Sequence, residues 1–153
     1  MVLEIGAKEE LRTALVEKMI ALAKDKKGVV VLEPSFATAE QWEQLGIPTV
    51  KGSEVVQAVN ALKVSKLDTP IVFANRYNGI DLPGDACRML VVSGIPKGMS
   101  DHHKLMSKIL VHSKVYARSI AQNIEQAMGR GTRGSGDYCV VALIGFDLCE
   151  WVN

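Results

Sequence analysis

The sequence predicts an α/β domain in which a mostly parallel sheet lies between two helical layers, a three-layer αβα arrangement. Short apolar runs alternate along the chain with longer segments whose apolar residues recur at helical spacing. The runs are unbroken, as in Val29–Leu32, which is typical of strands buried on both faces. Strands that alternate with helices favour right-handed crossovers between parallel strands, so helices should cover both faces of the sheet.

The expected elements are a helix over residues 6–26, a strand over 29–32, a helix through Leu45, a strand at 49–50, a helix over 53–64, strands over 70–74 and 89–92, a helix over 101–128 and a strand over 138–144. Thr38 and Gln41 have the spacing of a capping box, so Thr38 should begin the second helix. Helical periodicity predicts an inward face of Leu11, Leu15, Met19, Leu22 and Ala23 on the first helix and of Val55, Val56, Val59 and Leu62 on the third.

Size and composition limit the possible functions of the chain. A length of 153 residues predicts one domain over residues 1–153. A composition of 48% apolar and 23% charged residues argues against disorder. The net charge of +1 gives no overall attraction to nucleic acid, so such binding needs a local patch. No apolar run could span a membrane, and the N-terminus lacks a secretory signal pattern. Three cysteines without C-x-x-C spacing favour buried thiols in a reducing cytoplasm, and no set of metal ligands is expected.

Two loops that follow predicted strands carry polar residues suited to ligand binding. Ser35 and Thr38 precede or begin a helix, where hydroxyls and backbone amides can hold a phosphate, although plain helix capping explains the same residues. Asn75, Arg76, Gly79 and Asp81 lie in a loop after the 70–74 strand. Here Arg76 could contact a phosphate and Asp81 could accept hydrogen bonds from a ribose or from amides, whereas the alternative is a turn in which Asp81 caps its own backbone.

The most informative run lies between the long helix and the last strand. Gln126, Arg130 and Arg133 occupy positions i, i+4 and i+7, with Gly129 before the first arginine. This spacing puts an amide and two guanidiniums along one helical stripe, and guanidiniums match the oxygens of a phosphate that is being transferred. A solvated basic helix end is the alternative interpretation.

Taken together, these motifs resemble those of superfamily 2 helicases. The stretch from Ile71 to Lys97, with Gly79-Ile80-Asp81-Leu82-Pro83-Gly84 and the later turn Gly94-Ile95-Pro96, looks like motif V of the branch that includes the xeroderma pigmentosum group D protein. The 126–133 run resembles motif VI in order and spacing, and the segment Val29–Ser35 is similar to motif IV. The resemblance extends from about residue 6 to 148 and implies a RecA-like fold.

The chain departs from a complete helicase motor in ways that shape the expected function. It contains no G-x-x-x-x-G-K-[ST] phosphate loop and no D-E-x-[HD] element, and Asn78 stands where many relatives have arginine. The resemblance therefore implies the second, C-terminal motor domain of an ATP-dependent helicase or translocase, a fragment of a longer protein. ATP and Mg²⁺ would be held mostly by an N-terminal RecA-like domain, no metal would be held by this chain, and the isolated chain would be inactive.

The resemblance also implies roles for individual residues. Arg130 and Arg133 would act on the γ-phosphate as arginine fingers, with Gln126 positioning the arginine or the attacking water. Gly79, Asp81 and Gly129 would contact the nucleotide. The implied contacts to a single strand, DNA more than RNA, are Ser35, Thr38, Asn75 and Arg76.

Two alternatives use the same residues differently. A catalytically silent RecA-like module that binds nucleic acid or protein would explain the missing phosphate loop. A dinucleotide-binding enzyme is disfavoured because no G-x-G-x-x-G follows the first strand.

Overall fold

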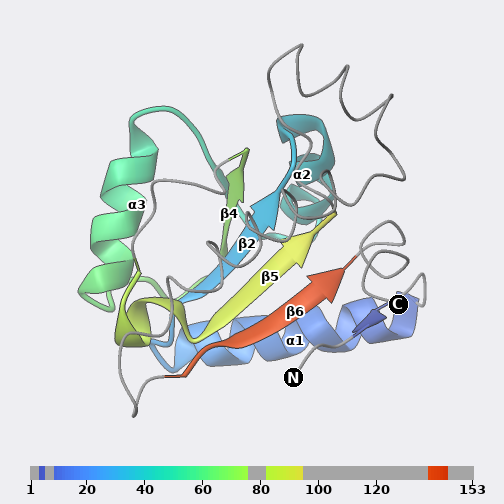
Figure 1. The fold of residues 1–153 in the computed structure, drawn as a ribbon, viewed down its shortest axis with the longest axis horizontal. Coiled ribbons are helices and arrows are strands. Elements are labelled where there is room, and N and C mark those ends of the chain that lie inside the picture. Colours follow the sequence, from blue (N-terminus) through green and yellow to red (C-terminus); the bar gives the residue numbers. More distant parts are fainter. Residues whose placement is uncertain (1–3, 6–8, 76–81, 95–137, 145–153) are drawn as a thin grey trace, which may run out of the picture.

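A parallel sheet forms the centre of the fold, and helices cover both of its faces (Figure 1). The computed structural model describes residues 4–5, 9–75, 82–94 and 138–144. The elements are β1 (Glu4–Ile5), α1 (Glu9–Lys24), β2 (Val29–Glu33), α2 (Phe36–Glu43), β3 (Thr49–Val50), α3 (Glu54–Lys63), β4 (Ile71–Ala74), the 3₁₀-helix η1 (Gly84–Cys87), β5 (Met89–Ser93) and β6 (Val140–Ile144).

Within the described residues the sheet has six strands in the order β1-β6-β5-β2-β4-β3, and each neighbouring pair is parallel. β2 lies between β4 and β5, with Val30 in register with both Ile71 and Leu90. This arrangement confirms the predicted three-layer α/β fold. Because all the strands run the same way, their carboxyl ends meet at one edge of the sheet, at the arrowheads in Figure 1.

Two apolar clusters fill the spaces between the sheet and its helices. Alternate residues of β2 point to opposite faces, as expected of a pleated strand. Val29 and Val31 pack on the face covered by α1 and α2, with Met19 and Trp42. Val30 and Leu32 pack on the face covered by α3 and η1. All five residues of β2 are buried, which explains the unbroken apolar run in the sequence.

The inward faces predicted for two helices need correction at one residue each. On α1, Leu15, Met19 and Ala23 are buried as predicted, but Leu11 is 46% exposed, and the unpredicted Val16 is buried beside Leu15. The buried stripe of α1 thus begins one turn after Leu11. On α3, Val56 is 65% exposed, because it lies about 100° around the helix from Val55 and outside the stripe that Val59 and Leu62 continue.

The start of α2 also differs from the prediction. The N-cap is Ser35, whose Oγ accepts a hydrogen bond of 3.2 Å from the amide of Thr38. Thr38 is therefore the third residue of the helix, and the capping box predicted to begin at Thr38 is wrong. The helix ends at Glu43, earlier than the predicted Leu45.

Some elements of the structure were not predicted, and one predicted helix cannot be compared with the structure. β1 and η1 were not predicted, and the long helix expected over residues 101–128 lies outside the described residues. Within the described ranges, no helix is long and apolar enough to cross a lipid bilayer.

Gly28 brings the start of β2 into backbone contact with η1. Its amide donates to the carbonyl of Asp85 at 2.7 Å, and its carbonyl accepts from the amide of Arg88 at 2.8 Å. A Cβ atom at this position would lie 1.9 Å from the carbonyl oxygen of Ala86. A backbone atom cannot yield as a flexible side chain can, so the position requires glycine.

Replacement of Gly28 by alanine should lower the free energy of unfolding by about 3 kcal/mol, because η1 must move away from β2. The matched control is Gly52→Ala, where φ is +56° and no atom lies within 4 Å of the new Cβ. That change should cost about 1 kcal/mol through backbone conformation alone. Urea denaturation of both variants checks the difference, and equal losses would contradict the packing interpretation.

Candidate nucleic-acid interface

The carboxyl edge of the sheet brings together the ends of four strands that are far apart in the sequence. After β2 and β4, the amide of Asn75 donates to the carbonyl of Glu33 at 2.7 Å. After β5 and β6, the amide of Gly94 donates to the carbonyl of Ile144 at 2.8 Å. A Cβ added to Gly94 would lie 3.4 Å from Cγ of Pro34, so the loops after β2 and β5 are also in contact. Ser35 and Asn75 thus lie at the same edge.

Ser35 and Thr38 form a compact cap at the start of α2. Their hydroxyl oxygens are 3.1 Å apart, and the Thr38 hydroxyl donates to the carbonyl of Ser35 at 3.0 Å. These contacts satisfy groups at the first turn that would otherwise need water or a ligand. Capping therefore accounts for the hydrogen bonds that both hydroxyls make, and a contact with a nucleic-acid backbone remains a prediction for them.

Asn75 occupies the position where the chain leaves β4. Its φ is +58°, a left-handed conformation that asparagine tolerates better than most residues. The turn keeps this polar residue at the carboxyl edge. The other predicted site residues lie outside the described residues: Arg76, Gly79, Asp81, Gln126, Gly129, Arg130 and Arg133. Their roles remain predictions.

A buried carboxylate at the end of β2 holds α2 in place at this edge. This role was not predicted from the sequence. Glu33, the last residue of β2, is only 1% exposed. Its Oε1 accepts hydrogen bonds from Nε2 of Gln41 at 3.0 Å and from Nε1 of Trp42. Both donors belong to α2, so the end of β2 holds the helix that starts with Ser35. The clue in the sequence was a glutamate that ended an apolar run.

A second layer of polar contact joins α1 to the same network. Nη2 of Arg12 donates to Oε1 of Gln41, and the Arg12 guanidinium lies 5.6 Å from the ring centroid of Trp42. The network therefore spans α1, α2 and β2. Because buried polar groups are costly unless they are paired, it favours one position of α2 on the sheet.

An exposed aromatic residue at the edge was also missed from the sequence. Phe36, the first residue of α2, is 48% exposed. Nζ of Lys51, which follows β3, lies 5.8 Å from its ring centroid and 3.8 Å from Oε1 of Glu43. The ion pair is exposed on both sides and therefore weak. Such a ring can stack a base, while the ammonium group can contact a phosphate. The sequence signal was an aromatic residue directly after Ser35.

Replacement of Glu33 by glutamine tests the support that β2 gives to α2. Glutamine keeps one carbonyl oxygen for the two donors but lacks the negative charge that strengthens both hydrogen bonds, so the variant should lose about 1–3 kcal/mol of unfolding free energy. Glu40→Gln is the control, because Glu40 is an exposed residue of the same helix and its change should stay within about 0.5 kcal/mol. Thermal or urea unfolding measures both, and a neutral Glu33→Gln would contradict the supporting role.

Comparison with known proteins agrees with this architecture. The family model described as the helicase C-terminal domain matches residues 18–145. The match begins within α1 and extends past β6, so it includes every loop described at the carboxyl edge. A search of curated proteins gave no match. Because the matched range covers most of the sequence, the chain belongs to the helicase C-terminal domain family.

Proposed function

We propose that this domain is the second motor domain of an ATP-dependent nucleic-acid helicase or translocase, in the branch that includes the xeroderma pigmentosum group D protein. The observation that carries the proposal is the helicase C-terminal domain match over residues 18–145. It contains all the strands from β2 to β6. ATP would bind between this domain and an N-terminal RecA-like domain of the same machine.

The division of labour in that cleft follows from what the sequence contains and lacks. Without a G-x-x-x-x-G-K-[ST] loop or a D-E-x-[HD] element, this chain would leave the phosphates and Mg²⁺ mostly to the N-terminal domain. Its own contribution would be Arg130 and Arg133 at the γ-phosphate, with Gln126 positioning them or the water. Gly79, Asp81 and Gly129 would contact the nucleotide. Charge stabilisation of this kind is a major part of phosphoryl-transfer catalysis.

The described carboxyl edge would form the binding surface for single-stranded nucleic acid, with DNA preferred to RNA. The Phe36 ring would stack on a base, and Lys51 would contact a phosphate beside it. Further contacts to the sugar-phosphate backbone of the strand would come from Ser35, Thr38, Asn75 and Arg76. Because the net charge is only +1, binding by the isolated domain should be weak and should depend on these few local contacts. We further propose a cytoplasmic location, which three cysteines without C-x-x-C spacing support.

The missing phosphate loop also supports a second candidate function. A catalytically silent RecA-like module would bind nucleic acid or protein through the same edge without serving an ATP cleft. The two functions differ in what Arg130 does. A motor domain needs that guanidinium for hydrolysis, whereas a silent module does not.

The first proposal is tested by measuring ATP hydrolysis. The protein assayed is a polypeptide that contains both this domain and an N-terminal motor domain. Arg130→Ala should lower nucleic-acid-stimulated kcat on the order of 10³-fold while circular dichroism shows the fold retained. Lys18→Ala, at an exposed position of α1, is the control and should keep full activity. Unchanged turnover in Arg130→Ala would favour the silent module. Hydrolysis by the isolated chain, lost in Arg130→Ala, would contradict the shared cleft.

The proposed stacking contact predicts a selective loss of strand binding. Phe36→Ala should weaken binding of a fluorescent oligothymidylate by about 10-fold, since one base–aromatic stack contributes about 1–3 kcal/mol. Leu45→Ala is the matched control, because Leu45 is equally exposed, at 45%, beyond the other end of α2. Fluorescence anisotropy at several salt concentrations measures both. Affinity that is independent of salt, or equal losses in the two variants, would contradict this account.

A further inference from the structure

Two cysteine thiols meet at the amino edge of the sheet, opposite the proposed nucleic-acid interface. Cys87 is the last residue of η1, and Cys139 directly precedes β6. They are 52 residues apart in sequence, yet their Sγ atoms are 3.8 Å apart. Both cysteines are in the reduced, thiol form. Cys87 is 3% exposed, whereas Cys139 is partly exposed. Neither residue belongs to the proposed ATP or nucleic-acid sites.

The backbone around the two thiols is held from several sides. The amide of Val140 donates to the carbonyl of Arg88 at 2.9 Å, and Nη1 of Arg88 donates to the carbonyl of Tyr138 at 2.9 Å. The Arg88 guanidinium also lies 4.4 Å from the centroid of the Tyr138 ring. Arg88, which follows Cys87, is therefore hydrogen-bonded to Tyr138 and Val140, the two neighbours of Cys139. The thiols remain neighbours without any rearrangement of the sheet.

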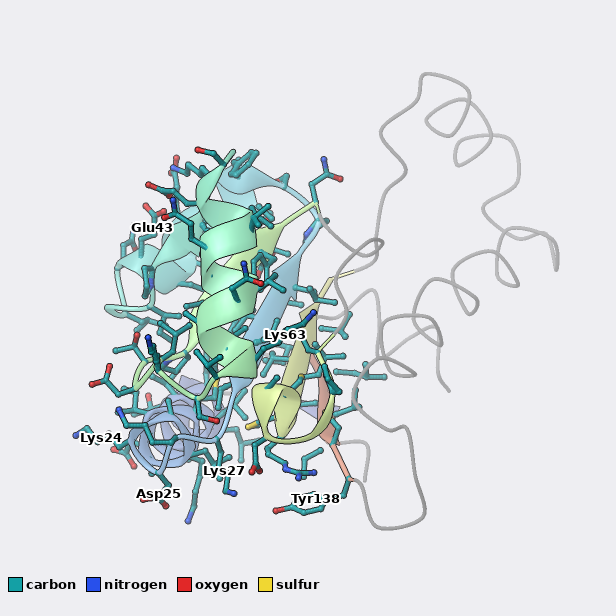
Figure 2. All side chains as sticks on the ribbon, turned by 90° about the vertical axis from the view of Figure 1, so that its left-hand side faces the viewer. Lys24, Asp25, Lys27, Glu43, Lys63 and Tyr138 are labelled. Carbon is teal, nitrogen blue, oxygen red and sulfur yellow. The ribbon has the colours of Figure 1, made fainter. Side chains whose placement is uncertain are left out.

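A charged cluster lies beside η1 at the same end of the molecule. The carboxylate of Asp85 accepts hydrogen bonds of 2.8 Å from Lys27 and from Arg88, and these bonds lower the pKa of Asp85. Figure 2 shows Lys27 and Tyr138 at this end. Because Gly28 also contacts η1 through its backbone, Cys87 sits on a segment fixed to β2 as well as to β5.

We propose that Cys87 and Cys139 form an oxidative modification site, at which a peroxide converts the two thiols into one disulfide. In the first step the Cys139 sulfur attacks a peroxide oxygen, an S–O bond forms, the O–O bond breaks, and the released hydroxide takes the thiol proton and leaves as water. The Cys87 sulfur then attacks the sulfur of the Cys139 sulfenic acid. An S–S bond forms, the S–O bond breaks, and the hydroxide takes the Cys87 proton and leaves as a second water. Both thiols lose their hydrogens, sulfur is oxidised by two electrons and the peroxide is reduced.

Exposure and acidity set the order of these steps. Cys139 reacts first because an oxidant can reach it from solvent. The adjacent Cys139 thiol and, next, burial raise the pKa of Cys87 well above its ordinary value, so Cys87 is a poor first nucleophile. It resolves the sulfenic acid because its sulfur is already in contact with that of Cys139. The product would join the end of η1 to the start of β6 across the amino edge of β5.

Peptide mapping of the oxidised chain tests the site. Cys139 and Cys149 share one tryptic peptide, since no lysine or arginine lies between residues 134 and 153, so the experiment uses the Cys149→Ser chain. Hydrogen peroxide should remove both remaining thiols, lower the intact mass by two hydrogens and link peptide 77–88 to peptide 134–153 within one chain. Dithiothreitol should reverse all three changes.

Single-cysteine variants provide the control. With Cys87→Ala, the same peroxide should convert Cys139 to a sulfenic acid that dimedone captures, because no resolving thiol remains. Circular dichroism establishes that each variant is folded. As a second probe, phenylarsine oxide should bridge the two thiols of the folded Cys149→Ser chain and should fail to do so in Cys87→Ala. Thiols that stay free under peroxide, links only between separate chains, or equal dimedone capture with and without Cys87 would overturn the proposal.

Discussion

Burial of β2 on both faces is the constraint on which the rest of this structure depends. All five of its residues are buried, and it pairs with β4 on one side and β5 on the other. Side chains that point both ways need an apolar partner above and below, which α1 and α2 provide on one face and α3 and η1 on the other. Such cover is compatible with parallel strands joined by crossovers. The common direction of the strands then brings all their carboxyl ends to one edge.

The two edges of the sheet are held by different chemistry. At the carboxyl edge, a buried carboxylate, Glu33, binds α2 through Gln41 and Trp42, so the helix that begins with Ser35 and Phe36 has a fixed place. At the amino edge, backbone hydrogen bonds of Gly28 hold η1 against β2, and the exposed Asp85 cluster lies beside them. We interpret the carboxyl edge as the nucleic-acid interface of a helicase domain. We interpret the amino edge as a structural region that also contains the proposed oxidation site, Cys87 and Cys139.

Features that depend on neighbouring residues were predicted from the sequence, whereas contacts between residues far apart in the sequence were not. Unbroken apolar runs predicted β2, β4, β5 and β6 because burial on both faces favours apolar residues along a strand, and the buried polar residues Glu33 and Ser93 stand only at strand ends. β1, with only two residues, gave no such pattern. Ser35 and Thr38 were both suitable caps, and the choice of Ser35 depends on where the chain leaves β2. Glu33 was visible as a charge at the end of a strand, but its partner Trp42 was not. The Cys87–Cys139 contact depends on a register across 52 residues that no local pattern reports.

NMR mapping of the bound strand would show whether the carboxyl edge of the sheet is the proposed nucleic-acid interface. The backbone amide spectrum of the 16.6 kDa chain would be recorded with increasing oligothymidylate at low salt. We expect shifts at Phe36, Lys51, Asn75 and Gly94, with Gly28 and Asp85 at the amino edge unchanged. Shifts confined to the amino edge, with Phe36 and Gly94 unaffected at saturating oligonucleotide, would contradict it.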